Sequence, residues 1–148
     1  MTFDIHPQLV HFPIVLITVS FILYLIGYFR KNRKLFTQSF FFGIAALASG
    51  FISAISGERA EEAIDENISK AFYDAIERHE LFANITIWFL FPVILAWGFY
   101  IGKKKENAVV DTIILFVLGL LTLSILYTGH LGGDLVYHYG AGVKLLFN

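Results

Sequence analysis

Five histidines are the side chains of this sequence best suited to hold a metal ion or a haem. They are His6, His11, His79, His130 and His138. Imidazole is a common ligand of zinc, copper and iron, and a b-type haem is held by axial histidines alone. The sequence contains no cysteine, which excludes disulfides, thiolate metal sites, iron–sulfur clusters and covalently attached c-type haem. The histidine imidazoles are therefore the groups expected to coordinate a metal ion or a haem iron.

The composition places these histidines in a membrane protein. Of the 148 residues, 57% are hydrophobic and only 16% are charged, and the mean hydropathy is +0.68. That apolar share is well above the share found in soluble domains. The formal net charge is −1, which gives no indication of nucleic-acid binding. We expect membrane lipid, and no nucleic acid, around this chain.

Four apolar segments are long enough to cross a bilayer, which takes roughly 20 residues. They run over about 9–29, 35–56, 81–101 and 109–128. Each is bounded by charged residues or glycine. The sequence therefore predicts an all-α fold, a four-helix transmembrane bundle with up-down-up-down topology, in a single membrane domain over residues 1–148.

Two short basic segments give the orientation. "RKNRK" at 30–34 joins the first two spans, and "GKKKEN" at 102–107 joins the last two. The positive-inside rule places both in the cytoplasm, so both termini and the acidic 57–80 segment are predicted outside. The first residues lack the basic segment of a signal peptide, so we expect the first span to stay in the mature protein.

The acidic segment carries the pattern of an amphipathic helix. Apolar residues recur every four positions, at Ile64, Ile68, Phe72 and Ile76. We expect a separate helix on the outer surface, with its apolar side toward the bundle. It is either a plain connector or a lid over a site below it.

The end of the sequence is rich in glycine. We expect Gly129 to stop the fourth helix and Gly132–Gly133 to form a turn. The apolar residues that follow are then expected to fold back over the outer end of the bundle. They are Leu135, Val136, Tyr137 and Val143.

On this topology all five histidines fall on the outer side. His11 lies about one turn inside the apolar run, where an unpaired imidazole is unfavourable, so we expect it to face the bundle and to meet His79 across the core. His130 arrives at a similar height from the fourth span. His6 lies five residues before His11, which places the two roughly 140° apart around a helix. We therefore expect Pro7 to begin the helix, a kink at Pro13 to tilt His11 inward, and His6 to be a capping or supporting residue.

A haem would also need a flat apolar slot, and the second span offers small residues. Ala46, Gly50 and Ala54 share one face at a spacing of four. Such a face either packs closely against a neighbouring helix or leaves room for a macrocycle. Aromatic residues, 17% of the chain, are available to line such a slot.

The two ends of the sequence resemble the signature ends of a known family. "HPQLVHFPIVL" at 6–16 and "GHLGGDLVYHYGAGV" at 129–143, with a histidine at the start of the third span, are similar to the domain of unknown function 2231 family of bacterial membrane proteins. The resemblance covers essentially the whole chain. It implies four spans in a bacterial cytoplasmic (inner) membrane. It also implies a redox partner, since some relatives occur beside c-type cytochrome domains.

Our leading hypothesis is a b-type haem protein that transfers single electrons near the outer face. His11 and His79 are the expected axial ligands of the haem iron. His130 and His6 are then supporting groups or part of an alternate site, and Asp134 orients a histidine such as His130. A c-type cytochrome or another redox subunit is the expected partner, and an oligomer is compatible with the sequence.

Two alternatives stay open. The first is a non-haem zinc or copper site built from the same outer histidines, His6, His11, His79 and His130, with Glu58 or Glu80 nearby. The second is a membrane subunit or scaffold without a cofactor. The sequence shows no nucleophile–base pair or substrate signature, so electron transfer or binding is expected rather than an enzyme with its own substrate.

Overall fold

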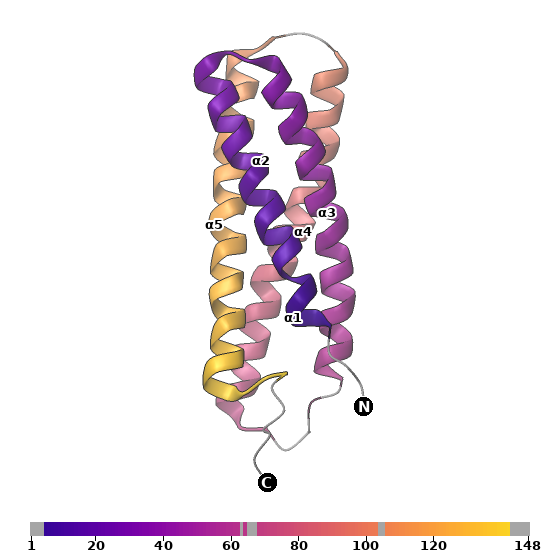
Figure 1. The fold of residues 1–148 in the computed structure, drawn as a ribbon, viewed down its shortest axis with the longest axis vertical. Coiled ribbons are helices and arrows are strands. Elements are labelled where there is room, and N and C mark those ends of the chain that lie inside the picture. Colours follow the sequence, from indigo (N-terminus) through magenta and orange to yellow (C-terminus); the bar gives the residue numbers. More distant parts are fainter. Residues whose placement is uncertain (1–4, 63, 65–67, 104–105, 143–148) are drawn as a thin grey trace.

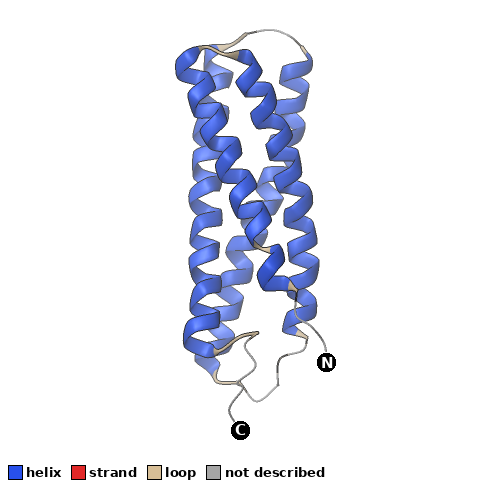
Figure 2. Ribbon diagram, in the orientation of Figure 1, coloured by secondary structure: helices blue, strands red, loops and turns tan. Residues whose placement is uncertain are grey.

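The computed structural model describes residues 5–62, 64, 68–103 and 106–142. Within these residues all regular secondary structure is helical (Figure 2). The helices are α1 (His6–Leu9), α2 (His11–Arg30), α3 (Arg33–Glu61), α4 (Lys70–Gly102) and α5 (Ala108–Tyr139). Counting α1 and α2 as one segment, four are long and apolar enough to cross a membrane, so the prediction of an all-α transmembrane bundle is confirmed.

The long helices form an up-down-up-down bundle (Figure 1). α2 packs on α3 and α5, and α4 packs on α5 and α3, so α2 and α4 lie diagonally opposite each other. We call the end where α2 joins α3 and α4 joins α5 the loop end. The opposite end holds α1, the last turns of α3 and α5 and the first turns of α4, and we call it the histidine end (Figure 1).

Local signals fix where the long helices begin. Asn32, Ser69 and Asn107 are N-cap residues in extended conformation, and each side chain accepts a hydrogen bond from a backbone N–H of the first turn. Lys31 adopts the left-handed conformation between α2 and α3. At the other end of the chain, α5 stops at Gly140, which has φ +70° and is suited to that conformation.

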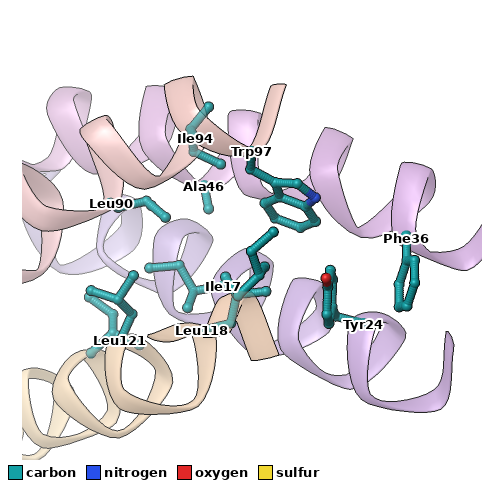
Figure 3. Close-up of a cluster of buried hydrophobic side chains, with 11 residues drawn as sticks. Ile17, Tyr24, Phe36, Ala46, Leu90, Ile94, Trp97, Leu118 and Leu121 are labelled. Carbon is teal, nitrogen blue, oxygen red and sulfur yellow. The ribbon is translucent and has the colours of Figure 1, made fainter. Parts of the chain in front are cut away.

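A continuous apolar core runs along the middle of the bundle (Figure 3). Its centre is Trp97, which is 1% exposed and meets the rings of Tyr24 and Phe40 edge-on at 5.2 Å. The buried members are Ile17, Tyr24, Phe36, Ala46, Leu90, Ile94, Trp97, Ile114, Leu118, Leu121 and Ile125. Large apolar side chains such as Phe29 and Trp88 are exposed on the outside of the bundle, as expected for helices surrounded by lipid.

The small residues of α3 serve close helix packing. A Cβ atom added at Gly43 would lie 2.7 Å from Ile94, and one at Gly50 would lie 3.1 Å from Ile87, both on α4. The space left by each missing side chain is therefore filled by a residue of the neighbouring helix. The other interpretation of this face, as a slot for a macrocycle, does not agree with this packing.

Two local predictions are wrong. The segment expected to form a separate outer helix instead supplies the first turns of α4, which begin at Lys70 and continue into the membrane span. Gly129, Gly132 and Gly133 do not end the last helix, because α5 runs through all three to Tyr139.

Contacts between the extended ends explain both differences. Ala75 and Ile76 of α4 form a small apolar cluster with Leu135 of α5, and the ring of Phe72 stacks on Tyr139 at 5.0 Å. These contacts stabilise the ends of α4 and α5 that extend beyond the apolar spans, so both segments stay helical. Leu135 is buried in this cluster, whereas Tyr137 is exposed and does not fold back. Val143 lies outside the described residues.

Candidate functional site

The histidines that meet inside the histidine end are His6 and His79. Their ring centroids lie 6.4 Å apart and their planes are almost perpendicular, at 86°. His6 comes from α1, which packs on α3, and His79 comes from α4. The pair therefore joins the two halves of the bundle.

His79 is held by α5. Its Nδ1 lies 3.0 Å from the carbonyl oxygen of Thr128. A carbonyl only accepts hydrogen bonds, so Nδ1 carries the hydrogen and Nε2 carries the lone pair in the neutral ring. Gly132 makes this close approach possible, because a Cβ atom there would lie 3.1 Å from Cε1 of His79.

His6 is held by α3 in the same way. Its Nδ1 lies 2.9 Å from Oγ of Ser56, and that hydroxyl donates to the carbonyl oxygen of Ser53 at 2.8 Å. Since a hydroxyl has one hydrogen, Nδ1 of His6 is the donor to Ser56, and Nε2 again carries the lone pair in the neutral ring. A Cβ atom at Gly57 would lie 3.1 Å from Cε1 of His6, so the glycine is needed for this contact.

The spacing of the two rings suits a shared metal ion. Metal–nitrogen bonds of about 2.0–2.1 Å place the centroids of two imidazoles on opposite sides of one ion about 6.3 Å apart. Two imidazoles at a tetrahedral angle would be closer, at about 5 Å. The observed 6.4 Å matches the arrangement on opposite sides. Orientation of the ring by a carbonyl or hydroxyl on the other nitrogen is also usual for metal-binding histidines.

Further hydroxyl groups lie inside the bundle, on the side of this pair toward the middle of the bundle. Ser53 is 6% exposed, and among the described residues its Oγ finds no hydrogen-bond partner. Oγ1 of Thr86 donates to a backbone carbonyl of its own helix, so Ser124 is the donor in the 2.7 Å bond that joins α4 to α5. Ser53 lies one helical turn from Gly57, toward the middle of the bundle, on the α3 face that carries Gly50. This hydroxyl is available to donate a hydrogen bond within the interior of the histidine end.

The expected orientation of His11 is wrong, because its side chain is exposed. The helix is interrupted at Val10, between α1 and α2, where the nitrogen of Pro13 cannot donate to the carbonyl of Leu9. Only one of two positions about 140° apart can face the bundle. Val10 keeps helical backbone angles, so His6 and His11 stay on different sides of the helix, with His6 against α3 and His11 outside.

His130 does not face the core either. Its side chain is 69% exposed, and it lies on the outer side of α5 with Asp134, 3.8 Å from one carboxylate oxygen. Glu58 and Glu80 are exposed too, and Asn84 approaches Glu80 at 3.5 Å. The sequence thus predicted a larger group of histidines and carboxylates. Among the described residues the structure brings His79 together with the expected supporting residue His6, and it places His130 beside Asp134 in a separate pair.

The described residues contain no group of three or more histidine, aspartate or glutamate side chains positioned to hold a metal ion. Within the described residues, an ion between His6 and His79 would have these two histidines as its ligands. The side chains available near this pair do not form the predicted flat slot, because the glycine gaps of α3 are filled by Ile94, Ile87 and the His6 ring itself. In this packing the residues do not fit a haem.

A second polar cluster lies at the loop end and was not predicted. Oδ1 of Asp111 accepts hydrogen bonds from Tyr100 at 2.9 Å and from Arg33 at 3.0 Å, with the hydroxyl of Tyr24 at 3.4 Å. Arg33 also pairs with Glu106 at 3.0 Å. The sequence signal was present, since an acidic residue inside an apolar run is unfavourable without partners. This cluster ties both loops of that end to the core.

Comparison with known proteins supports the membrane assignment. Residues 2–145 match a protein family described as "Predicted membrane protein (DUF2231)". The search of curated proteins and the search of solved structures each found no match. The comparisons therefore give a family and no activity.

Proposed function

The chain belongs to the DUF2231 family of predicted membrane proteins, and we propose that it binds one cuprous ion between His6 and His79. The observation that carries the proposal is the geometry of the pair. Both rings are oriented through Nδ1, at 2.9 and 3.0 Å, and their centroids are spaced for ligands on opposite sides of one ion.

Copper in the monovalent state fits this ligand set better than zinc or divalent copper. Zinc sites in proteins are almost always tetrahedral with at least three protein ligands, and divalent copper favours a square arrangement of nitrogen and oxygen. A filled-shell cuprous ion accepts two nitrogen ligands in a nearly linear arrangement. A single positive charge between neutral imidazoles also costs less to bury than a double charge. The buried hydroxyl of Ser53 would face a water near the ion.

The orientation predicted from the basic loops places this ion at the outer face of the bacterial cytoplasmic membrane. There the protein would hold copper in the reduced state and exchange it with a partner outside the membrane. A c-type cytochrome stays a predicted partner. Haem, the cofactor expected from the sequence, is the competing hypothesis. A pair of histidines is present for its iron, but Ile94, Ile87 and the His6 ring fill the glycine gaps of α3 where the macrocycle was expected to lie.

The test is copper loading of purified protein without a tag, in detergent and under anaerobic reducing conditions. Titration against a chromophoric cuprous chelator should give one ion per chain. His6→Ala and His79→Ala should each lose this ion, whereas His11→Ala should retain it. His11 is the matched control, because it lies on the adjoining turn and is exposed.

An optical spectrum of the protein as purified separates the cofactors. A Soret band that disappears in His6→Ala and His79→Ala would overturn the cuprous proposal in favour of haem. Equal copper binding by the native protein and both alanine variants would overturn the assignment of these ligands. Ser56→Ala leaves both ligands in place but removes the orienting hydroxyl, and should weaken binding about tenfold or more.

A further inference from the structure

A second group of metal-binding side chains lies on the surface of α5. His130, Asp134 and His138 follow one another at intervals of four residues, so they occupy one face of the helix. This face is separate from the first site, because Gly132, which contacts His79, lies two residues and roughly 200° away from His130 and from Asp134. The side chains of His130 and His138 are 69% and 71% exposed.

The carboxylate of Asp134 lies between the two histidines. Oδ1 is 3.4 Å from Nδ1 of His138, and Oδ2 is 3.8 Å from Nε2 of His130. Both separations are long for a hydrogen bond. An oxygen and a nitrogen that share one ion, with bonds of about 2.0–2.2 Å and angles between a right angle and a tetrahedral angle, lie about 2.9–3.5 Å apart. The Asp134–His138 pair already has this separation, and the His130 pair does not.

We propose that Asp134 and His138 chelate a divalent transition-metal ion on the surface of the histidine end. A carboxylate and an imidazole suit divalent copper and nickel, and water would supply the remaining ligands because the site is exposed. Spacing of two ligands by four residues on one helix face is also how helical zinc motifs present their histidines. Two protein ligands agree with the finding that no group of three is positioned for a metal in the described residues. This site does not depend on the cuprous ion proposed between His6 and His79.

The test uses divalent copper as the probe, on protein without a tag at neutral pH and under oxidising conditions. Electron paramagnetic resonance should show one bound ion with a nitrogen and an oxygen ligand. Asp134→Asn and His138→Gln should each lower the affinity about tenfold or more, because each removes a ligand rather than a supporting group. His11→Gln is the matched control, since His11 is exposed but has Pro7 and Val15, not a carboxylate, four residues away.

Repeating the measurement in a His6→Ala background keeps the two proposals distinguishable. The surface site should bind divalent copper equally well in that background, even though the cuprous ion is lost. Affinity of Asp134→Asn within twofold of the native protein would overturn the proposal. A loss of binding in His130→Gln with none in His138→Gln would overturn the choice of ligand pair. The side chains of His130, Asp134 and His138 are 69%, 41% and 71% exposed, so variants at these three positions should keep the helical content and the unfolding transition of their parent protein.

Discussion

Alanine substitutions at the neighbouring glycines of α5 should have opposite effects on stability. Both Gly132 and Gly133 lie in the interior of the helix, where alanine is favoured over glycine by ~0.5–1 kcal/mol. A Cβ atom at Gly133 meets nothing within 4 Å. We therefore expect Gly133→Ala to raise the free energy of unfolding by about that amount.

Gly132→Ala brings the same gain in helix propensity but a steric cost. Its Cβ atom would lie 3.1 Å from Cε1 and 3.4 Å from Nδ1 of His79. The ring cannot move away freely, because its Nδ1 is bonded to the carbonyl of Thr128 at 3.0 Å. Overpacking of this kind costs ~1–3 kcal/mol. Gly132→Ala should therefore be less stable than Gly133→Ala by ~1–3 kcal/mol.

Unfolding in mixed detergent micelles, followed by helical circular dichroism, measures both variants against the native protein. Cuprous ion affinity adds a second readout, since a displaced His79 should bind more weakly in Gly132→Ala and normally in Gly133→Ala. Equal stabilities for the two variants would refute the close packing of His79 on α5. Destabilisation by Gly133→Ala of more than about 1 kcal/mol would indicate a turn at this position rather than a helix.

Five further substitutions test the loop end and the core. Asp111→Asn removes the charge that pairs with an arginine and should lower the free energy of unfolding by about 1–3 kcal/mol, less than for a fully buried pair because the arginine is partly exposed; stability that does not change at low salt would contradict this. Tyr100→Phe should cost ~1–2 kcal/mol through loss of the 2.9 Å bond to that carboxylate, whereas Tyr28→Phe, which removes an exposed bond, should cost less than about 0.5 kcal/mol. Trp97→Ala should cost ~3–5 kcal/mol and Trp88→Ala far less, because only the first is buried; equal denaturation midpoints for the two would count against the described core.

The membrane spans were the easiest part to predict, because long apolar runs separated by charge leave few other arrangements. The helix ends were harder. Hydropathy marks where the apolar run stops, but α4 and α5 continue beyond it because Phe72 and Tyr139 stack and Leu135 is buried between the helices. These contacts join residues far apart in sequence, so no local sequence pattern predicts them.

Rotation about the helix axis decided which histidines meet. The spacing of His6 and His11 sets the angle between them but not which of the two faces the bundle, since that depends on the packing of α1 on α3. His79 could be placed near the interior from its position at the start of a span. Its partner is His6, and the groups that orient the two rings are the Thr128 carbonyl and the Ser56 hydroxyl. These contacts depend on how the helices pack on one another, including α1 on α3, and only the assembled bundle shows this.

The two polar clusters of the bundle have no hydrogen-bonded path between them within the described residues. The apolar core lies between the His6–His79 pair and the carboxylate of Asp111, and one of its members, Tyr24, carries the hydroxyl that approaches Asp111. The buried hydroxyls of Ser20, Ser39 and Thr122 each donate to a backbone carbonyl. A change of protonation at His6 or His79 would therefore not be relayed to Asp111 through the hydrogen bonds of the described residues, and the two ends of the bundle would titrate independently.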